Sequence, residues 1–513
     1  MNMKTRTRAA QRLSSLKSER SHYIEEWRDM SDFVSGSRGR YLLSKGQKIS
    51  DRRNPKLYNE EAKFSNNVLA SGMMSGITSP ARPWFTLGTP DPDLMEFRPV
   101  KEWLTSVQRT LLTVFARSNF YNSVFSQYKE LGCFGTGAMG IYEDFNNIIR
   151  CETYTAGSYC LATNGRREVD TFYREYVLTV EQLVSRFGLK NCSNIVQRLY
   201  DKGNYDSPIE IFHGIEPNRN RNHKSPFAKD MAFSSFYFEA GESSDRALDS
   251  SGFKEDPIMS PRWEVIGEDV YASSYPALDC IGTNQALQIE EMDKALAIEK
   301  MHNPPLVADG SLDADDLDLI AGGVTFIPNM AALGKPSLQS VYDVNLRIGD
   351  LKEDIAQKES RIQRMFYADL FMMISEMDRA QITATEIAER KEEKLLMLGP
   401  VLERLNNELL DPAIDRVFSI AQRKGIIPPP PKELQGVDLR VEYISVLAQA
   451  QRAVSTASME STASFAMNLA QGNPDAFDKI DTHQMGDEHA SAKGAPPKTT
   501  KTDDDVPKTT KAR

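Results

Sequence analysis

The first pattern along the chain is a helical repeat of apolar residues near its start. Leu13, Leu16, Trp27 and Met30 recur at helical spacing, with polar and charged residues between them. Such a repeat gathers the apolar side chains on one face of a helix. We therefore predict a long amphipathic helix over residues 5–34.

The next part of the chain predicts a strand and two more helices. Small residues dominate 70–79, and a strand-like aromatic run follows at 84–87. Helices are expected over 93–119 and 120–132, and these lead into a glycine cluster.

Between residues 140 and 275 the pattern changes to short β-branched and aromatic runs separated by turn residues. These runs lie at 141–142, 171–173, 209–212, 233–238 and 263–266. One amphipathic helix is expected among them, over 179–188. An antiparallel β segment with an inserted helix predicts an α+β fold, which the rest of the chain makes mainly helical.

Two long helices are predicted after residue 275, on either side of a short acidic segment. Ile289, Met292 and Leu296 lie at i, i+3 and i+7, which predicts a helix over 278–302. An apolar stripe predicts a second helix over 345–373. Asp309, Asp313, Asp315, Asp316, Asp318 and Asp343 all lie in the intervening segment, 303–345.

The last helix with a clear beginning starts at Thr383. Thr383 and Glu386 have the spacing of a capping box, and a leucine repeat follows them as far as Leu409. Pro400 and Pro412 are expected to kink this helix, and Gly425 to end it. A strand over 439–444 and a final helix over 445–471 are predicted, followed by a disordered tail from about residue 487.

Composition and charge narrow the classes of function. Of the 513 residues, 40% are hydrophobic and 26% are charged, and the net charge is −10. The length suits about two to four domains. Proteins that grip nucleic acid by neutralising phosphates are usually basic, so tight DNA binding by the whole surface is disfavoured. Only residues 1–56 are strongly basic, with 14 Lys and Arg against 6 Asp and Glu.

The cysteines predict a chain without disulfide bonds, and the hydropathy predicts one without a membrane-spanning segment. The five cysteines are far apart and form no CxxC pair, which favours reduced, buried thiols over disulfides or a zinc site. We find no signal-peptide pattern and no run of about 18 apolar residues. We therefore expect a soluble protein of a reducing compartment, with no bound metal and no cofactor.

Two motifs of enzymes and metal sites fit the sequence poorly. The run at 135–140 matches GxGxxG, but a helix precedes it and a strand follows, the reverse of the dinucleotide-binding order. A tight backbone crossing is the better interpretation. A calcium loop that starts at Asp313 fails because Leu317, Asp318 and Val324 replace residues that such a loop requires. No phosphate-binding GxxxxGK[ST] motif is present, so we do not expect this chain to hydrolyse ATP.

Several stretches in fixed order resemble the portal, or head-to-tail connector, proteins of short-tailed bacteriophages. They are ASGMMSGITSP at 70–80 with PWF at 83–85, FGTG at 134–137, ITATEIAER at 382–390 and EYISVLAQAQ at 442–451. The resemblance extends from about residue 10 to residue 490. It implies a homo-oligomeric ring of twelve subunits at one capsid vertex, around a channel for packaging and ejecting double-stranded DNA.

The resemblance also implies partners and a location. An ATP-driven terminase would dock on the ring during packaging, and tail adaptor proteins would replace it. Capsid and scaffold proteins would surround the ring. We expect assembly in the host cytoplasm and a final place at the head–tail junction of the virion.

The parts of the family's subunit can be assigned to residue ranges by their order. They are a basic N-terminal helix (1–39), an α+β wing (40–277 and 383–444), stem helices (278–302 and 345–373), a clip (303–344), a channel loop (374–382), a crown (445–486) and a disordered tail (487–513).

The assignment gives two sets of candidate site residues. Those expected to face DNA in the channel are Arg379, Gln381, Lys358, Arg361 and Arg364. Those expected to dock partners from the clip are Asp309, Asp313, Asp315, Asp316 and Asp318. On the second stem helix five basic side chains are balanced by five acidic ones, so a salt-bridged face is the competing interpretation there. For the whole chain, the alternatives are another structural component of the head–tail junction and a nucleotide-binding enzyme.

Overall fold

The computed structural model describes most of the first 443 residues. The described residues are 5–35, 57–91, 94, 97–219, 221–222, 224–225, 227–241, 247–304, 306–309, 320–321, 323–327, 338–340, 348–376, 398–434 and 440–443. Their helices are α1 (Thr5–Met30), α2 (Glu61–Gly76), α4 (Arg98–Arg117), α5 (Phe120–Phe134), α6 (Val180–Phe187), α7 (Asn194–Asp201), α8 (Pro276–His302), α9 (Ile348–Met365), α10 (Ala368–Glu376) and α12 (Asp411–Arg423).

The strands form four sheets. The strands are β1 (Phe85–Gly88), β2 (Ala138–Asp144), β3 (Ile148–Tyr154), β4 (Tyr159–Thr163), β5 (Val169–Thr179), β6 (Pro208–Pro217), β7 (Phe233–Glu239), β8 (Asp249–Phe253), β9 (Ile258–Met259), β10 (Leu306–Asp309), β11 (Val324–Ile327), β12 (Leu338–Ser340) and β13 (Arg440–Tyr443). The largest sheet has the order β4-β5-β6-β7-β8, a second has β3-β2-β9, a third has β11-β10-β12, and β1 pairs with β13.

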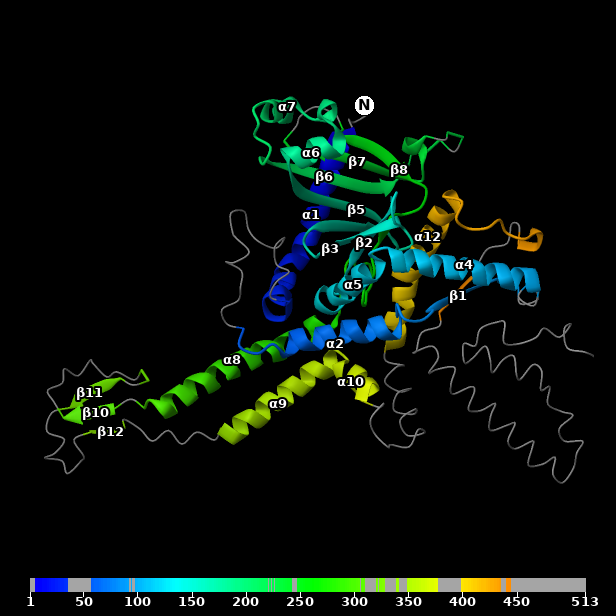
Figure 1. Ribbon diagram of the computed structural model, residues 1–513. Helices are drawn as coiled ribbons and strands as arrows, with labels where there is room; N and C mark the ends of the chain where they lie inside the picture. The colour runs from blue at the N-terminus through cyan, green and yellow to red at the C-terminus, as the bar shows by residue number, and fades with distance from the viewer. Residues whose placement is uncertain are drawn as a thin grey trace, which may run out of the picture.

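The five-stranded sheet has helices on both faces (Figure 1). Successive residues of a strand point to opposite faces, and here Phe212 packs with α1 whereas Ile211 packs with α6 and α7. All four strand pairs are antiparallel. The predicted antiparallel segment with an inserted helix is therefore confirmed, but α7 was not predicted.

The basic side chains of α1 form ion pairs and hydrogen bonds within the subunit. Arg8 and Lys17 form ion pairs with Glu216 and Glu175 on the sheet, and Arg20 donates to the carbonyl oxygens of Gly157 and Tyr159. The apolar residues Leu13 and Leu16 are buried against the same sheet. The predicted N-terminal helix is confirmed, and these three cations bind the body of the protein.

Helix α2 was missed because its sequence lacks a contrasting apolar stripe. Its small residues instead allow close packing. A Cβ atom added at Gly72 would lie 2.1 Å from the ring of Phe371 on α10. Helix α2 also packs against α5, where the side-chain oxygen of Asn66 would lie 2.1 Å from a Cβ atom at Gly132. The small residues are thus a packing surface between helices that are distant in sequence.

The glycine cluster is a tight backbone crossing, as predicted. Helix α5 ends at Phe134 and strand β2 begins at Ala138. Gly135 adopts a left-handed φ of 69°, and a Cβ atom there would lie 2.4 Å from the ring of Tyr275. A side chain does not fit this crossing.

Two sequence predictions of secondary structure are wrong. The helix expected over 345–373 is interrupted at residues 366–367, where Tyr367 has a left-handed φ of 55°, and α10 starts afresh at Ala368. The run at 263–266 makes only an isolated bridge between Glu264 and Ser274, because its neighbours do not extend the pairing.

The C-terminal part of the described chain returns to the body. Residues 398–405 are helical, a π-helical turn follows at Asn406–Leu410, and α12 then starts next to Pro412. Gly425 follows the helix with a left-handed φ of 69°, as predicted. The predicted strand over 439–444 is confirmed as β13. The capping box at Thr383, the final helix over 445–471 and the tail lie outside the described residues.

Candidate functional site

Helices α8 and α9 lie side by side and project from the body (Figure 1). We call these two helices the projecting pair. At their outer end lies the small sheet of β10, β11 and β12. The predicted helix over 278–302 is confirmed by α8, and α9 covers most of the predicted second helix.

The root of α8 is held by a buried polar network. The side-chain amide of Asn284 donates to the carbonyl oxygen of Phe33 at 2.9 Å. Gln288 accepts from the backbone N–H groups of Tyr58 and Asn59 at 2.7 and 2.9 Å and donates to the carbonyl oxygen of Asn59 at 3.0 Å. Buried polar groups need such partners. The network therefore sets where α8 leaves the body.

We predict that Gln288→Leu lowers the free energy of unfolding by about 1–2 kcal/mol, because it leaves the partly buried N–H groups of Tyr58 and Asn59 without their acceptor. Thermal melting measures this loss. Gln285→Leu, on a partly exposed face of α8, is the matched control and should change the melting temperature much less. Equal losses in both variants would show that the network does not stabilise the root.

Ion pairs join the two helices further out. Lys358 on α9 contacts both Glu290 on α8 and Asp354 on its own helix. Burial opposes the charged form of Lys358, but these two hydrogen bonds raise its pKa. The hydrogen bond from Lys358 likewise lowers the pKa of Asp354. Lys358, a predicted channel residue, is thus engaged between the helices.

Asn59 and Gln363 extend this polar contact towards α2. The side chain of Asn59 donates to Glu359 on α9 at 2.8 Å, and Gln363 donates to Glu61 on α2 at 3.0 Å. Together with Lys358, these contacts fix α9 against both α8 and α2. Sequence reasoning missed this junction. The only signal for it is a pair of polar residues one helical turn apart, Asn284 and Gln288, on the buried face of α8.

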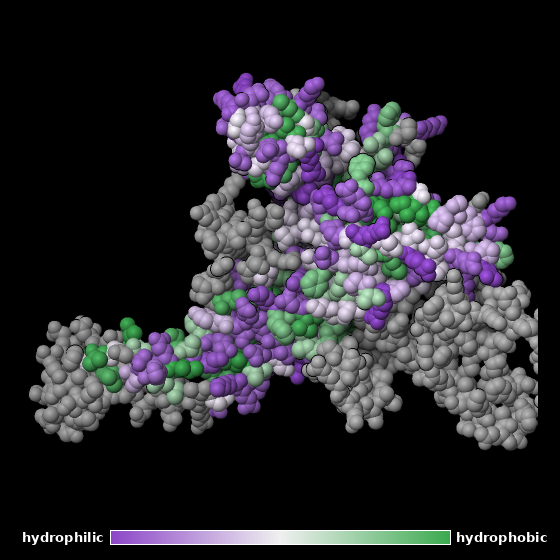
Figure 2. All heavy atoms as spheres, viewed as in Figure 1, coloured by the Kyte–Doolittle hydropathy of each residue, from purple (hydrophilic) through white to green (hydrophobic). Residues whose placement is uncertain are grey.

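The apolar stripe that predicts α8 faces away from the body. Ile289 and Leu296 are 57% and 46% exposed, whereas the face that carries Ala277, Cys280 and Leu287 is buried. Figure 2 shows hydrophobic residues among hydrophilic ones along the projecting pair. Exposed apolar residues that share a helix face are typical of a surface that another chain covers.

The outer sheet pairs β10 in parallel with β11 and antiparallel with β12. Asp309, a predicted docking residue, is the last residue of β10. Asp313, Asp315, Asp316 and Asp318 lie outside the described residues.

Of the remaining predicted channel residues, two lie on α9 and two follow α10 in the sequence. Arg361 and Arg364 are exposed on α9. Arg379 and Gln381 lie outside the described residues. Helix α10 continues to Glu376, so residues 374–376 of the predicted channel loop are helical.

The part of the chain that the structure describes contains no cluster of three His, Cys, Asp or Glu side chains suited to a metal ion. All five cysteines are free and buried, as predicted. Among the described helices, none is both long and apolar enough to cross a membrane.

Comparison with known proteins connects this architecture to a family. The family described as bacteriophage head to tail connecting protein matches residues 6–500. The portal protein of Salmonella phage epsilon15 is 45% identical over 490 residues, which cover 96% of this chain and 88% of that protein. The probable portal protein of Bordetella phage BPP-1 is 40% identical over 486 residues, which cover 95% of this chain and 87% of that protein. This chain therefore belongs to the portal, or head-to-tail connecting, proteins of short-tailed bacteriophages, structural components of the virion head that act in genome packaging.

Proposed function

We propose that twelve copies of this chain form a closed ring around a DNA channel at one capsid vertex. The observation that carries this proposal is the exposed apolar stripe of Ile289 and Leu296 on the projecting pair. In a closed ring each subunit presents one surface to the next copy, so such a stripe is covered all around the ring. Negative-stain electron microscopy of the purified full-length protein should show rings with a central hole. Monomers or open filaments at high protein concentration would contradict the proposal.

Within this ring, the projecting pair corresponds to the stem and the outer sheet to the clip, and the sheets near α1 form the wing. Helices α8 and α9 together carry nine acidic and six basic side chains. A channel wall with few free cations lets DNA slide, because each phosphate contact adds affinity and salt dependence. Arg361 and Arg364 are the exposed cations of α9 proposed to face DNA, and Lys358 contributes through the ion pairs that hold the wall together.

The clip is proposed to dock the terminase during packaging and tail adaptor proteins afterwards. We predict that changing Asp313, Asp315, Asp316 and Asp318 together to Asn leaves the ring intact and slows docking, because exposed charge of one sign mainly speeds and orients encounter. Surface plasmon resonance at low salt measures the association rate. Unchanged docking kinetics would contradict an electrostatic role for these carboxylates.

The segment after α10 is proposed to be the channel loop, with Arg379 and Gln381 towards DNA. Twelve copies of Arg379 would place a ring of positive charge at the DNA backbone. We predict that replacing 377–381 by five glycines leaves ring assembly unchanged but lowers the amount of DNA retained in filled heads. The DNA content of purified virions measures this effect, and a normal content would leave the loop without a role in retention. A role as a different head–tail component remains the alternative, and it predicts no effect on packaging at all.

A further inference from the structure

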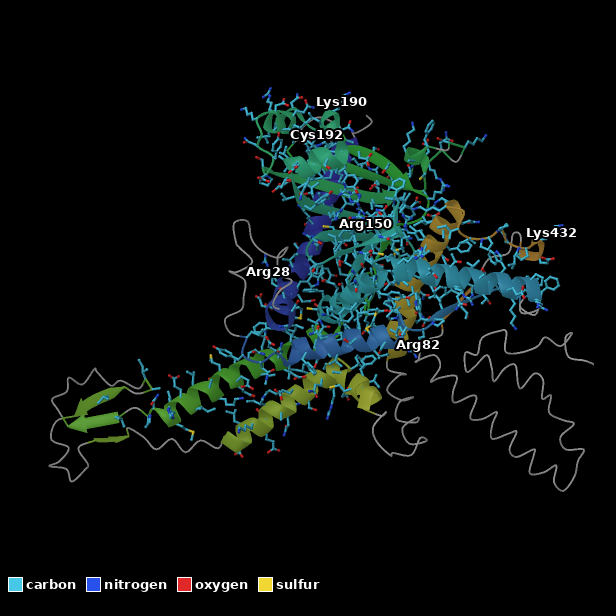
Figure 3. The ribbon with its side chains drawn as sticks, viewed as in Figure 1. Arg28, Arg82, Arg150, Lys190, Cys192 and Lys432 are labelled. Carbon is cyan, nitrogen blue, oxygen red and sulfur yellow. The ribbon has the colours of Figure 1, made fainter. Side chains whose placement is uncertain are left out.

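A polar pocket of about 400 Å³ lies in the body, away from the projecting pair. Its floor is the face of the five-stranded sheet that carries Ser235 and Tyr237. The β2–β3 hairpin forms one wall through Arg150, and α6 forms the other through Arg186. Figure 3 labels Arg150 on the hairpin side, and Lys190 and Cys192 beside α6. This volume falls in the range of small-ligand sites.

Arg186 is held in place by aromatic contacts instead of a carboxylate. Its guanidinium donates to the hydroxyl of Tyr237 at 3.2 Å and lies 5.1 Å from the centre of that ring. It also lies 5.3 Å from the ring of Phe187. Among the described residues Arg186 forms no ion pair. A positioned guanidinium retains donors for a bidentate contact with an oxyanion.

A further arginine, Arg174, adds positive charge beside the pocket, on the face of the sheet that carries Tyr237. Arg174 is largely buried and shares Glu152 with Arg150, at 3.5 and 2.8 Å respectively. His213, opposite Arg174 in the strand register, is fully buried and stacks on Tyr237 with ring centres 3.9 Å apart. Burial, and then the charges of Arg174 and Arg186, hold the pKa of His213 well below its usual value. The imidazole is therefore neutral, chiefly because it is buried, and the two arginine charges act in the same direction.

The carboxylates near the pocket do not cancel this charge. Glu152 is shared between Arg150 and Arg174, and Asp249 is exposed. Two arginines and two carboxylates line the pocket, and Arg174, which does not line it but pairs with Glu152, adds a third positive charge nearby. Ser235 and Ser251 are direct partners in the register of β7 and β8, and both line the pocket. The hydroxyl of Ser235 also shares a hydrogen bond of 3.1 Å with the Nε2 atom of His213. Donors from the hairpin, α6 and the sheet approach from separate elements, an arrangement suited to a tetrahedral anion with oxygens in several directions.

We propose that this pocket binds a phosphate group, with Arg186 and Arg150 as its charged ligands and the serine hydroxyls as further donors. The phosphate group belongs either to free inorganic phosphate or to a mononucleotide, whose base would contact the aromatic side chains that line the pocket. Phe253 and Tyr142 also line it. The site is distinct from the projecting pair and from the proposed DNA channel.

Isothermal titration calorimetry of the full-length protein tests the proposal with two probes, inorganic phosphate and deoxyadenosine monophosphate, at constant ionic strength. We expect saturable binding of at least one probe, weakened by about tenfold or more in Arg186→Gln, since a charge-assisted bidentate contact is lost. Arg198→Gln, an exposed arginine of α7 that does not line the pocket, is the matched control and should bind as the parent does. Tighter binding of the mononucleotide identifies it as the ligand class, and equal binding identifies the phosphate group alone.

Two results would overturn the proposal: no saturable binding of either probe, or equal affinity in the parent and Arg186→Gln. If Arg186→Gln does not fold, as judged by circular dichroism, Arg186→Lys takes its place. This variant retains the charge but loses the planar fork, so it should still bind more weakly than the parent. Unchanged affinity in Arg186→Lys would then contradict the proposed contact.

Discussion

Changing Ile289 and Leu296 together to Asp should abolish ring assembly while the subunit still folds. Both side chains are about half exposed on the same face of α8, so neither substitution opens a cavity in the body. In the proposed ring the next subunit covers this stripe. Each carboxylate would then be buried without a partner, at a cost of several kcal/mol in every interface. Ring-shaped particles should disappear from negative-stain images.

The control for this experiment is Ala295→Asp. Ala295 is also exposed on α8 but lies outside the stripe, so one added carboxylate there should leave rings intact. The free energy of unfolding of the dissociated subunits, obtained from thermal melting, should change by only about 0.5 kcal/mol or less, as for ordinary surface substitutions. Normal rings from the double variant would show that this stripe is not the interface between subunits.

Arg416→Met should cause a large loss of stability, about 3–5 kcal/mol. Arg416 is only 1% exposed. Its guanidinium donates to the carbonyl oxygen of Ile141 at 2.7 Å and to that of Glu255 at 3.2 Å, and its Cζ atom lies 5.3 Å from the ring centre of Phe253. A methionine fills much of the volume but leaves buried acceptors without a donor.

The loss in Arg416→Met should also depend on pH. Burial raises the pKa of nearby Asp256 to about 7, and the charge of Arg416 opposes that rise. Since the folded pKa lies above the unfolded value, the stability that protonated Asp256 contributes is present in acid and is lost as the pH rises through about 7. Without Arg416 the ionised carboxylate loses its nearby cation, so the variant should lose more stability at pH 8 than at pH 5.

Arg423→Met is the matched control for Arg416→Met. Arg423 lies on the same helix and pairs with Glu255 and Glu143 near the surface, at 2.7 and 2.8 Å. Such surface pairs contribute about 0–1 kcal/mol. Denaturant titrations of both variants at the two pH values measure the difference. Similar losses in both variants, or a loss in Arg416→Met that does not vary with pH, would contradict this account of the buried arginine.

Local patterns in the sequence were sufficient to predict most of the helices. The repeat from Leu13 to Met30 predicts α1, and the spacing of Ile289 and Leu296 predicts α8. The order of helix, glycines and strand around Gly135 correctly indicated a backbone crossing instead of a nucleotide site. These features succeed because helical periodicity and glycine geometry depend on residues close in the chain.

The errors occur where local contrast is weak or misleading. Helix α2 carries small residues on the face that meets Phe371, so no apolar stripe marks it. The break at Tyr367 depends on a left-handed backbone conformation, which is uncommon for a tyrosine and is not signalled by its neighbours. For the candidate site residues on α9, the charge pattern was consistent with two interpretations, a salt-bridged face and a DNA-facing wall.

Local patterns predicted most of the helices and strands and indicated the family, because these depend on residues close together in the chain or on stretches in a fixed order. How the elements pair depends on contacts between distant segments and is visible only in the folded chain. Strand β1 pairs with β13 across more than three hundred residues, and Lys358 contacts Glu290 on another helix. The stripe of α8 points outward, while the face that carries Asn284 and Gln288 is buried. These choices depend on the surfaces that distant segments present to one another, and periodicity within a single segment carries no information about its partner.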